Sequence, residues 1–185
     1  MKIAWSRVIM KSCIIVPFGV VIGAAAREAL DREFALITRE LAGEPRVLCH
    51  RDYHSSNLMV HDGGLWLIDF QDALVGPYTY DLVSLLRDSY VVLTPAEVAT
   101  LVDHYLSRRP DLDPDAFRQD FALQTIQRKL KDSGRFIFIE LVKKNPSFLP
   151  YVLPSLGYVR EAFDRVPELG ELRALLSKYA PELKP

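Results

Sequence analysis

The chain carries the sequence HRDYHSSN at residues 50–57 and LIDF at residues 67–70. The first stretch holds a carboxylate, Asp52, and an amide five positions later, Asn57. The second holds another carboxylate, Asp69. A carboxylate, an amide and a second carboxylate in this order are typical of phosphoryl-transfer sites of the kinase type. The rest of the chain is therefore interpreted as the structure that surrounds such a site.

The residues around the two stretches predict how they are brought together. Residues 47–49 (VLC) read as a short buried strand that leads into His50, so that residues 50–57 form a loop. Residues 58–60 and 65–68 are apolar runs separated by HDGG, which predicts a β-hairpin because glycine tolerates positive φ. We expect this hairpin to place Asn57 and Asp69 side by side.

The predicted arrangement suits phosphoryl transfer from ATP. Mg²⁺ neutralises charge on the phosphate oxygens and prefers hard oxygen ligands, which Asn57 and Asp69 supply. A carboxylate within hydrogen-bonding distance of the acceptor hydroxyl can take its proton, and Asp52 is the candidate for this base. His50 is better placed to hold the loop by hydrogen bonds.

Two other interpretations of these residues stay open. Asp and Asn after a strand are often only turn formers whose side chains cap local backbone groups. Alternatively, His50, Asp52, His54 and Asp69 could bind zinc or iron in a hydrolase, although no zinc-hydrolase spacing such as HExxH is present.

Length and composition favour one compact domain. The chain has 185 residues, 49% of them hydrophobic, which is enough for one substantial core. Its net charge is -1 and it has no block of basic residues, so nucleic acid is not an expected partner. Cys13 and Cys49 have no CxxC spacing, which fits a reducing cytoplasm.

The first 26 residues form a segment of their own. Lys2, Arg7 and Lys11 precede an apolar run over residues 13–21, as in a secretory signal. Pro17 and Gly19 interrupt that run, which is also too short to span a bilayer. We therefore expect a buried segment at residues 1–26, no membrane association, and one domain over residues 27–185.

Most of that domain is predicted to be helical. From Ala24 the pattern becomes helical, and Leu30, Phe34, Ile37 and Leu41 line one face of a helix that Gly43 and Pro45 end. A second helix is expected to begin at the capping box of residues 94–97. A third is expected to begin at Asp113-Pro114, to continue through residues 136–139 and to end at Asn145. Two more are expected over residues 147–165 and 168–179. Four polar residues of the helix after Pro114 could face a ligand or form an exposed face: Gln124, Gln127, Arg128 and Lys131.

The motifs together resemble a known family. His50-x-Asp52-x4-Asn57, then residues 68–70 (IDF), then Gly76-Pro77-x3-Asp81-Leu82 are similar to the C-terminal lobe of the aminoglycoside phosphotransferase and choline kinase-like family. Residues 50–55, 68–73 and 80–88 are most similar to its bacterial anomeric kinases of N-acetylmuramate and N-acetylglucosamine. The resemblance covers residues 30–176.

The resemblance implies a fold and a set of roles. The fold would be mainly α with a small β-hairpin, an α+β kinase-like C-terminal lobe. Asp52 would be the catalytic base, and Asn57 and Asp69 would bind the Mg²⁺ ions that bridge the ATP phosphates. Asp81 would support the catalytic loop together with His50; it could also be an ordinary helix N-cap, alone or in addition to that role. The substrate would be the anomeric hydroxyl of an amino sugar.

The sequence also departs from the family pattern. His54 and Gln71 stand where protein kinases have lysine and glycine, which argues against a protein substrate. The glycine-rich loop and strand lysine of the N-terminal lobe are not recognisable before His50, so we expect that lobe to belong to a full-length form. An aminoglycoside or another metabolite remains an alternative substrate, as does a catalytically incomplete binding module.

Overall fold

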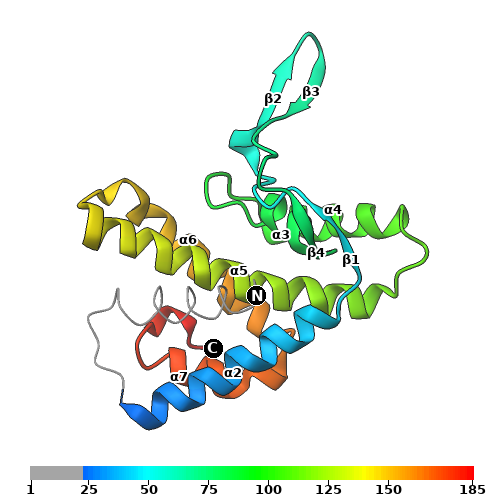
Figure 1. Ribbon diagram of the computed structural model, residues 1–185. Helices are drawn as coiled ribbons and strands as arrows, with labels where there is room; N and C mark the ends of the chain where they lie inside the picture. Colours follow the sequence, from blue (N-terminus) through cyan, green and yellow to red (C-terminus); the bar gives the residue numbers. More distant parts are fainter. Residues whose placement is uncertain (1–22) are drawn as a thin grey trace.

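The computed structural model describes residues 23–185, which fold into helices and two small antiparallel sheets (Figure 1). The predicted mainly helical fold with little β structure is confirmed. The predictions for the segment up to residue 22, including the signal-like run and Cys13, lie outside the described residues. Between residues 23 and 185, no helix is both long and apolar enough to cross a bilayer.

The first described helix, α2 (Ala24–Gly43), has the bounds and the buried face that its periodicity predicts. Leu30, Phe34, Ile37 and Leu41 are all buried. The helix ends where Glu44 takes an extended conformation before Pro45, because a residue that precedes proline is disfavoured in the helical region.

Strand β1 (Arg46–Cys49) pairs with β4 (Leu74–Pro77), which the sequence did not predict. Gly76-Pro77 reads locally as a turn, and only the distant partner strand makes it β structure. The expectation that β1 is buried is wrong for most of it, since Leu48 is 75% exposed and only Cys49 is covered. A Cβ at Gly76 would lie 3.0 Å from the Cys49 Sγ, so glycine lets the two strands approach.

Strands β2 (Leu58–His61) and β3 (Gly64–Leu67) form the predicted hairpin, which projects from the helical body in Figure 1. Asp62 and Gly63 both have positive φ, 48° and 73°, as a type I′ turn requires. The hairpin pairs Leu58 with Leu67. Residues just outside this pair therefore lie at the same end of the hairpin.

Two helices follow the strands and pack on the beginning of α5. They are α3 (Tyr80–Leu86) and α4 (Pro95–Ser107), the latter with the predicted capping box between Thr94 and Glu97. Helix α5 (Pro114–Lys143) begins at the Asp113 cap and ends at Lys144, which has φ 54°. A first core joins the three helices through Tyr78, Val83, Leu86, Val98, Val102, Leu106, Phe117 and Phe121.

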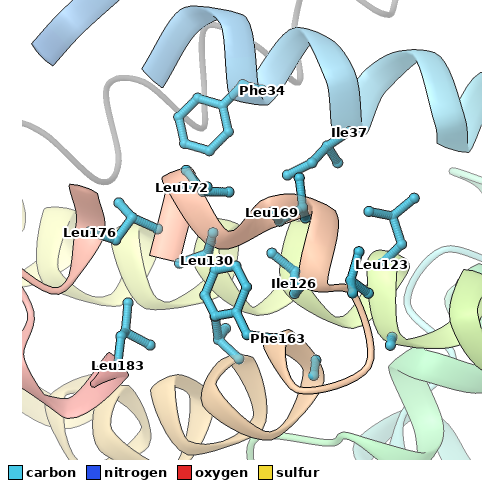
Figure 2. Close-up of a cluster of buried hydrophobic side chains, with 14 of the residues drawn as sticks. Phe34, Ile37, Leu123, Ile126, Leu130, Phe163, Leu169, Leu172, Leu176 and Leu183 are labelled. Atoms are coloured by element: carbon cyan, nitrogen blue, oxygen red, sulfur yellow. The ribbon is translucent and has the colours of Figure 1, made fainter. Parts of the chain in front are cut away.

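The second, larger core joins α2 and the middle of α5 to α6 (Val152–Phe163) and α7 (Gly170–Leu176). Figure 2 shows Phe34 and Ile37 of α2 facing Leu172 and Leu169, with Ile126 and Leu130 of α5 beyond. Three 3₁₀ turns complete this part of the chain: Pro146–Tyr151, Pro167–Leu169 and Pro181–Leu183. The helices predicted over 147–165 and 168–179 are shorter than expected, since each begins only after a 3₁₀ turn that starts at a proline, Pro146 or Pro167.

A buried carboxyl group connects the end of α2 to the beginning of α3. The Thr79 hydroxyl donates a 2.7 Å hydrogen bond to Glu44 Oε2, and both side chains are buried. Burial raises the pKa of Glu44 to about 8, even though the bond from Thr79 favours the ionised form. Glu44 is thus largely protonated in the folded chain at neutral pH.

This carboxyl group predicts a pH-dependent stability. Below about pH 4.5 Glu44 is protonated in both states, and up to about pH 8 only the folded state keeps the proton. The free energy of unfolding should therefore fall as pH rises across that window, by up to about 1.4 kcal/mol per pH unit. We expect Glu44→Gln to flatten the profile and to stabilise the chain at pH 8, measured by urea unfolding from pH 5 to 9.

The control for Glu44→Gln is Glu28→Gln, which changes an exposed glutamate of α2, the helix that Glu44 follows. Its profile should follow that of the unchanged chain. A Glu44→Gln profile with the original slope would show that this carboxyl group is already ionised in the folded state.

Candidate functional site

The loop of residues 50–57 lies between β1 and β2, and Asp81 holds its beginning. The backbone N–H of His50 donates to Asp81 Oδ2 at 2.6 Å, and that of Arg51 donates to Asp81 Oδ1 at 2.9 Å. The cap of α3 is Thr79, so the Asp81 carboxylate serves the loop and the N-cap alternative is excluded. Its two bonds help to hold Arg51 at φ 79°, a conformation that costs free energy in residues other than glycine.

A second aspartate, Asp88, holds the end of the same loop. Its Oδ2 accepts hydrogen bonds from the Ser55 N–H at 2.9 Å and the Ser55 hydroxyl at 2.6 Å, at the start of the 3₁₀ turn Ser55–Asn57. Its Oδ1 accepts from the N–H of Tyr90 at 2.8 Å. Asp88 had no assigned role in the sequence. It lies just beyond the end of α3, and the signal that could have found it is that the family-like stretch of residues 80–88 ends with it.

His50 ties the loop to the end of the hairpin. Its buried ring bonds through Nε2 to the carbonyl oxygen of Ile68 at 2.9 Å, so Nε2 carries the proton. The next residue, Asp69, has φ 67°, and its Oδ1 accepts a 2.6 Å hydrogen bond from Gln71. His50 therefore holds the backbone before Asp69, and Gln71 holds the Asp69 carboxylate.

Asn57 and Asp69 lie at the same end of the hairpin. The Ile68 N–H donates to the Asn57 carbonyl oxygen at 3.1 Å, which places Asn57 beside the residue that precedes Asp69. The side-chain Nδ2 of Asn57 donates to the Asp52 carbonyl oxygen at 2.9 Å, which leaves its amide oxygen for another ligand. An amide oxygen and an exposed carboxylate are hard donors that suit Mg²⁺, which keeps several waters or phosphate oxygens.

Asp52 meets a buried cation from α5. Its side chain is 47% exposed, and its Oδ1 lies 3.9 Å from Arg128 Nη2. Arg128 Nη1 donates to the Arg51 carbonyl oxygen at 3.1 Å, and the guanidinium lies 4.9 Å from the centre of the Tyr80 ring. Because Arg128 is buried, the expected exposed polar face is wrong here. Contacts with residues far away in sequence put Arg128 against the loop.

Further buried charges surround Arg128. Lys129 Nζ donates to Asp132 at 3.1 Å and to the Ser89 hydroxyl at 2.9 Å, and Arg128 Nε lies 3.9 Å from Asp132. Burial alone would raise the pKa of Asp132, but Lys131, Arg128 and Lys129 hold it well below its usual value. Asp132 is therefore ionised at neutral pH and offsets the positive charge beside the loop.

The zinc or iron alternative has little support. His50 uses Nε2 on a backbone carbonyl, and His54 Nδ1 is hydrogen-bonded to the Ser56 hydroxyl at 2.8 Å. Over residues 23–185, no three His, Cys, Asp or Glu side chains converge in a way that could hold a metal ion.

Comparison with known proteins decides the family. Residues 21–118, more than half of the chain, match the model of the phosphotransferase enzyme family. The chain belongs to this family. The matched range contains the whole loop, the hairpin and both of the aspartates that hold the loop.

The chain is also similar to curated proteins that share one name. The N-acetylmuramate/N-acetylglucosamine kinase of Neisseria meningitidis is 38% identical over 142 residues, 74% of this chain and 42% of that protein. Proteins with the same name from Pseudomonas putida and Caulobacter vibrioides are each 32% identical, over 83% and 85% of this chain and 47% and 45% of their own lengths. The chain thus spans somewhat less than half the length of the curated relatives it matches.

The two bonds to Asp81 lead to a prediction for Asp81→Asn. One accepting oxygen becomes an NH₂ group that cannot accept from a backbone N–H, so at least one charge-assisted bond is lost. We expect the free energy of unfolding to fall by about 1.5–3 kcal/mol, measured by urea unfolding at pH 7.

Asp103→Asn is the matched control for Asp81→Asn, because it removes an exposed aspartate that pairs with Arg118. Such pairs contribute about 0–1 kcal/mol. Equal losses in the two variants would mean that Asp81 does not anchor the loop.

Proposed function

We propose that this chain is the catalytic part of an ATP-dependent kinase that phosphorylates a hydroxyl group of an N-acetylated amino sugar. The supporting observation is the loop of residues 50–57, which Asp81 and Asp88 hold at its two ends beside the hairpin end that carries Asn57 and Asp69. The names of the curated relatives, which are all N-acetylmuramate/N-acetylglucosamine kinases, support the substrate class.

In this proposal Asp52 is the general base. Its half-exposed carboxylate accepts the proton of the acceptor hydroxyl as that oxygen bonds to the transferred phosphorus. Arg128 steadies the loop through the Arg51 carbonyl and sets the charge beside Asp52. Because the side chain of Asn57 donates to the Asp52 carbonyl, the base and the proposed metal ligand move together.

Asn57 and Asp69 would hold Mg²⁺ through their oxygens. When bound, the metal neutralises charge that develops on the phosphate oxygens. Gln71 and the bond of His50 to Ile68 hold Asp69 in its left-handed conformation and so orient its carboxylate.

The finer parts of the proposal rest on the family resemblance. In this proposal the phosphorylated hydroxyl is the anomeric one. Residues 27–185 form one domain, and the enzyme works in the cytoplasm, where ATP is available. The remaining nucleotide contacts come from a lobe with a glycine-rich loop in a full-length form. An aminoglycoside acceptor has less support, because the relatives are named for amino sugars.

The proposal predicts ATP-dependent phosphorylation of N-acetylglucosamine and N-acetylmuramate by a form that carries both lobes. In that form Asp52→Asn should lower kcat by about 10²–10⁴, since a positioned general base contributes that much. Asp69→Asn should lower activity at limiting Mg²⁺, with partial recovery at high Mg²⁺. A coupled assay of ADP release measures both effects.

The control for both is Asp62→Asn at the exposed turn of the hairpin, where asparagine tolerates positive φ. It should leave turnover unchanged. Full activity of Asp52→Asn would remove Asp52 from its role, and absence of phosphorylated sugar with the intact enzyme would refute the proposed substrate class.

A separate prediction concerns nucleotide binding by the 185-residue chain alone. Asn57 and Asp69 offer ligands for the metal, but no glycine-rich loop precedes them, so we expect Mg-ATP to bind with a Kd of about 1 mM or weaker. Isothermal titration calorimetry measures this. Micromolar binding that Asp69→Asn abolishes would show that the chain needs no further lobe for the nucleotide.

A further inference from the structure

A cavity of about 450 Å³ lies between α2, the β1–β4 sheet and α5. Leu41, Leu74 and Val75 form part of an apolar wall, and Gln124 and Gln127 of α5 form part of a polar one. Pockets of about 300–1,000 Å³ with mostly apolar walls and a few convergent polar groups are typical of small-molecule sites.

The cavity adjoins the loop that carries Asp52. Arg51 and Tyr80 line the cavity, and the same two residues contact Arg128, through the Arg51 carbonyl and the Tyr80 ring. Arg128 in turn lies 3.9 Å from the Asp52 carboxylate. Since Gln124 is four residues before Arg128 on α5, the polar wall begins one helical turn from the cation beside Asp52.

Gln124 has an unusual place in this wall. It is 1% exposed, and its Nε2 donates to Gln127 Oε1 at 2.9 Å. Its Oε1 has no hydrogen-bond partner among the residues that the structure describes. A buried acceptor without a partner costs about 1–3 kcal/mol, so this side chain is a poor choice for stability alone.

We propose that this cavity binds the acceptor of the reaction, with the acetamido group of an N-acetylated amino sugar against Gln124. Gln124 Oε1 is shielded in the free chain, so binding requires its side-chain amide to turn toward the cavity, where the acetamido N–H can complete its bonds. The acetyl methyl group matches the apolar wall of Leu41, Leu74 and Val75. This inference rests on the proposed function, because it assigns the sugar of that reaction to a place in the fold.

Methyl NMR spectroscopy of the chain tests the location. With assigned Leu and Val methyl signals, N-acetylglucosamine should shift those of Leu41, Leu74 and Val75 in a saturable way. Glucosamine and glucose, which lack the acetyl group, should bind at least about tenfold more weakly, a factor that corresponds to one hydrogen bond or one buried methyl group.

The variant Gln124→Met separates a binding role from a structural one. It keeps the length of the side chain and removes the unpaired acceptor, which offsets the loss of the bond to Gln127, so thermal stability should be kept. Affinity for N-acetylglucosamine should fall about tenfold. Gln119→Met is the matched control, since Gln119 is an exposed residue of the same helix that bonds to Glu168, and it should leave affinity unchanged.

Three results would overturn the proposed site. They are the absence of saturable shifts at the three residues, shifts confined to the separate cavity around His50 and Phe70, and unchanged affinity in Gln124→Met. The ADP-release assay on the form that carries both lobes keeps the two proposals distinct. If the sugar is phosphorylated but any of these three results is found, the cavity is not the acceptor site and the proposed function stands. If the methyl signals shift specifically but no sugar is phosphorylated, the kinase proposal is refuted and the cavity remains a sugar-binding site.

Discussion

One carboxylate, that of Asp81, accepts hydrogen bonds from two successive backbone N–H groups, those of His50 and Arg51. The site depends on this contact, because it turns the chain away from β1 with Arg51 in a left-handed conformation. The turn leaves the Arg51 carbonyl to Arg128 and brings the His50 ring to the Ile68 carbonyl. A hydrogen bond to a charged group contributes about 1.5–3 kcal/mol, which is of the same order as the cost of the strained residue.

Helix α5 relates this loop to the rest of the molecule. Its first turns complete the core with α3 and α4, and its middle packs with α2, α6 and α7 (Figure 2). From the same middle section of the helix, Gln124 lines the cavity and Arg128 bonds to the loop. Burying Arg128, Lys129 and Asp132 together is tolerated because opposite charges and hydrogen bonds replace the lost water. Removing Asp132 would leave Arg128 and Lys129 without the carboxylate that they share.

Much of the fold could be predicted because its signals are local. The bounds of α2 and the Thr94 capping box follow from spacing within a few residues, and so does the hairpin turn at Asp62 and Gly63. Strand β4 could not be predicted, since its pairing with β1 joins segments far apart in the chain. For the candidate site, the roles of Asp52, Asn57 and Asp69 stay predictions from their order and chemistry. The contribution of Asp88 to the loop became visible only through its bonds to Ser55.

By itself the sequence determined the helical character of the chain, the hairpin and the family to which it belongs. These depend on periodicity, turn chemistry and motif spacing, which the order of residues contains directly. Only the tertiary structure decided that Arg128 and Gln124 are buried rather than exposed. The polar face of a helix has the same pattern whether water or another part of the protein covers it. Which of the two does so is settled when α5 packs beneath the loop and beside the β1–β4 sheet.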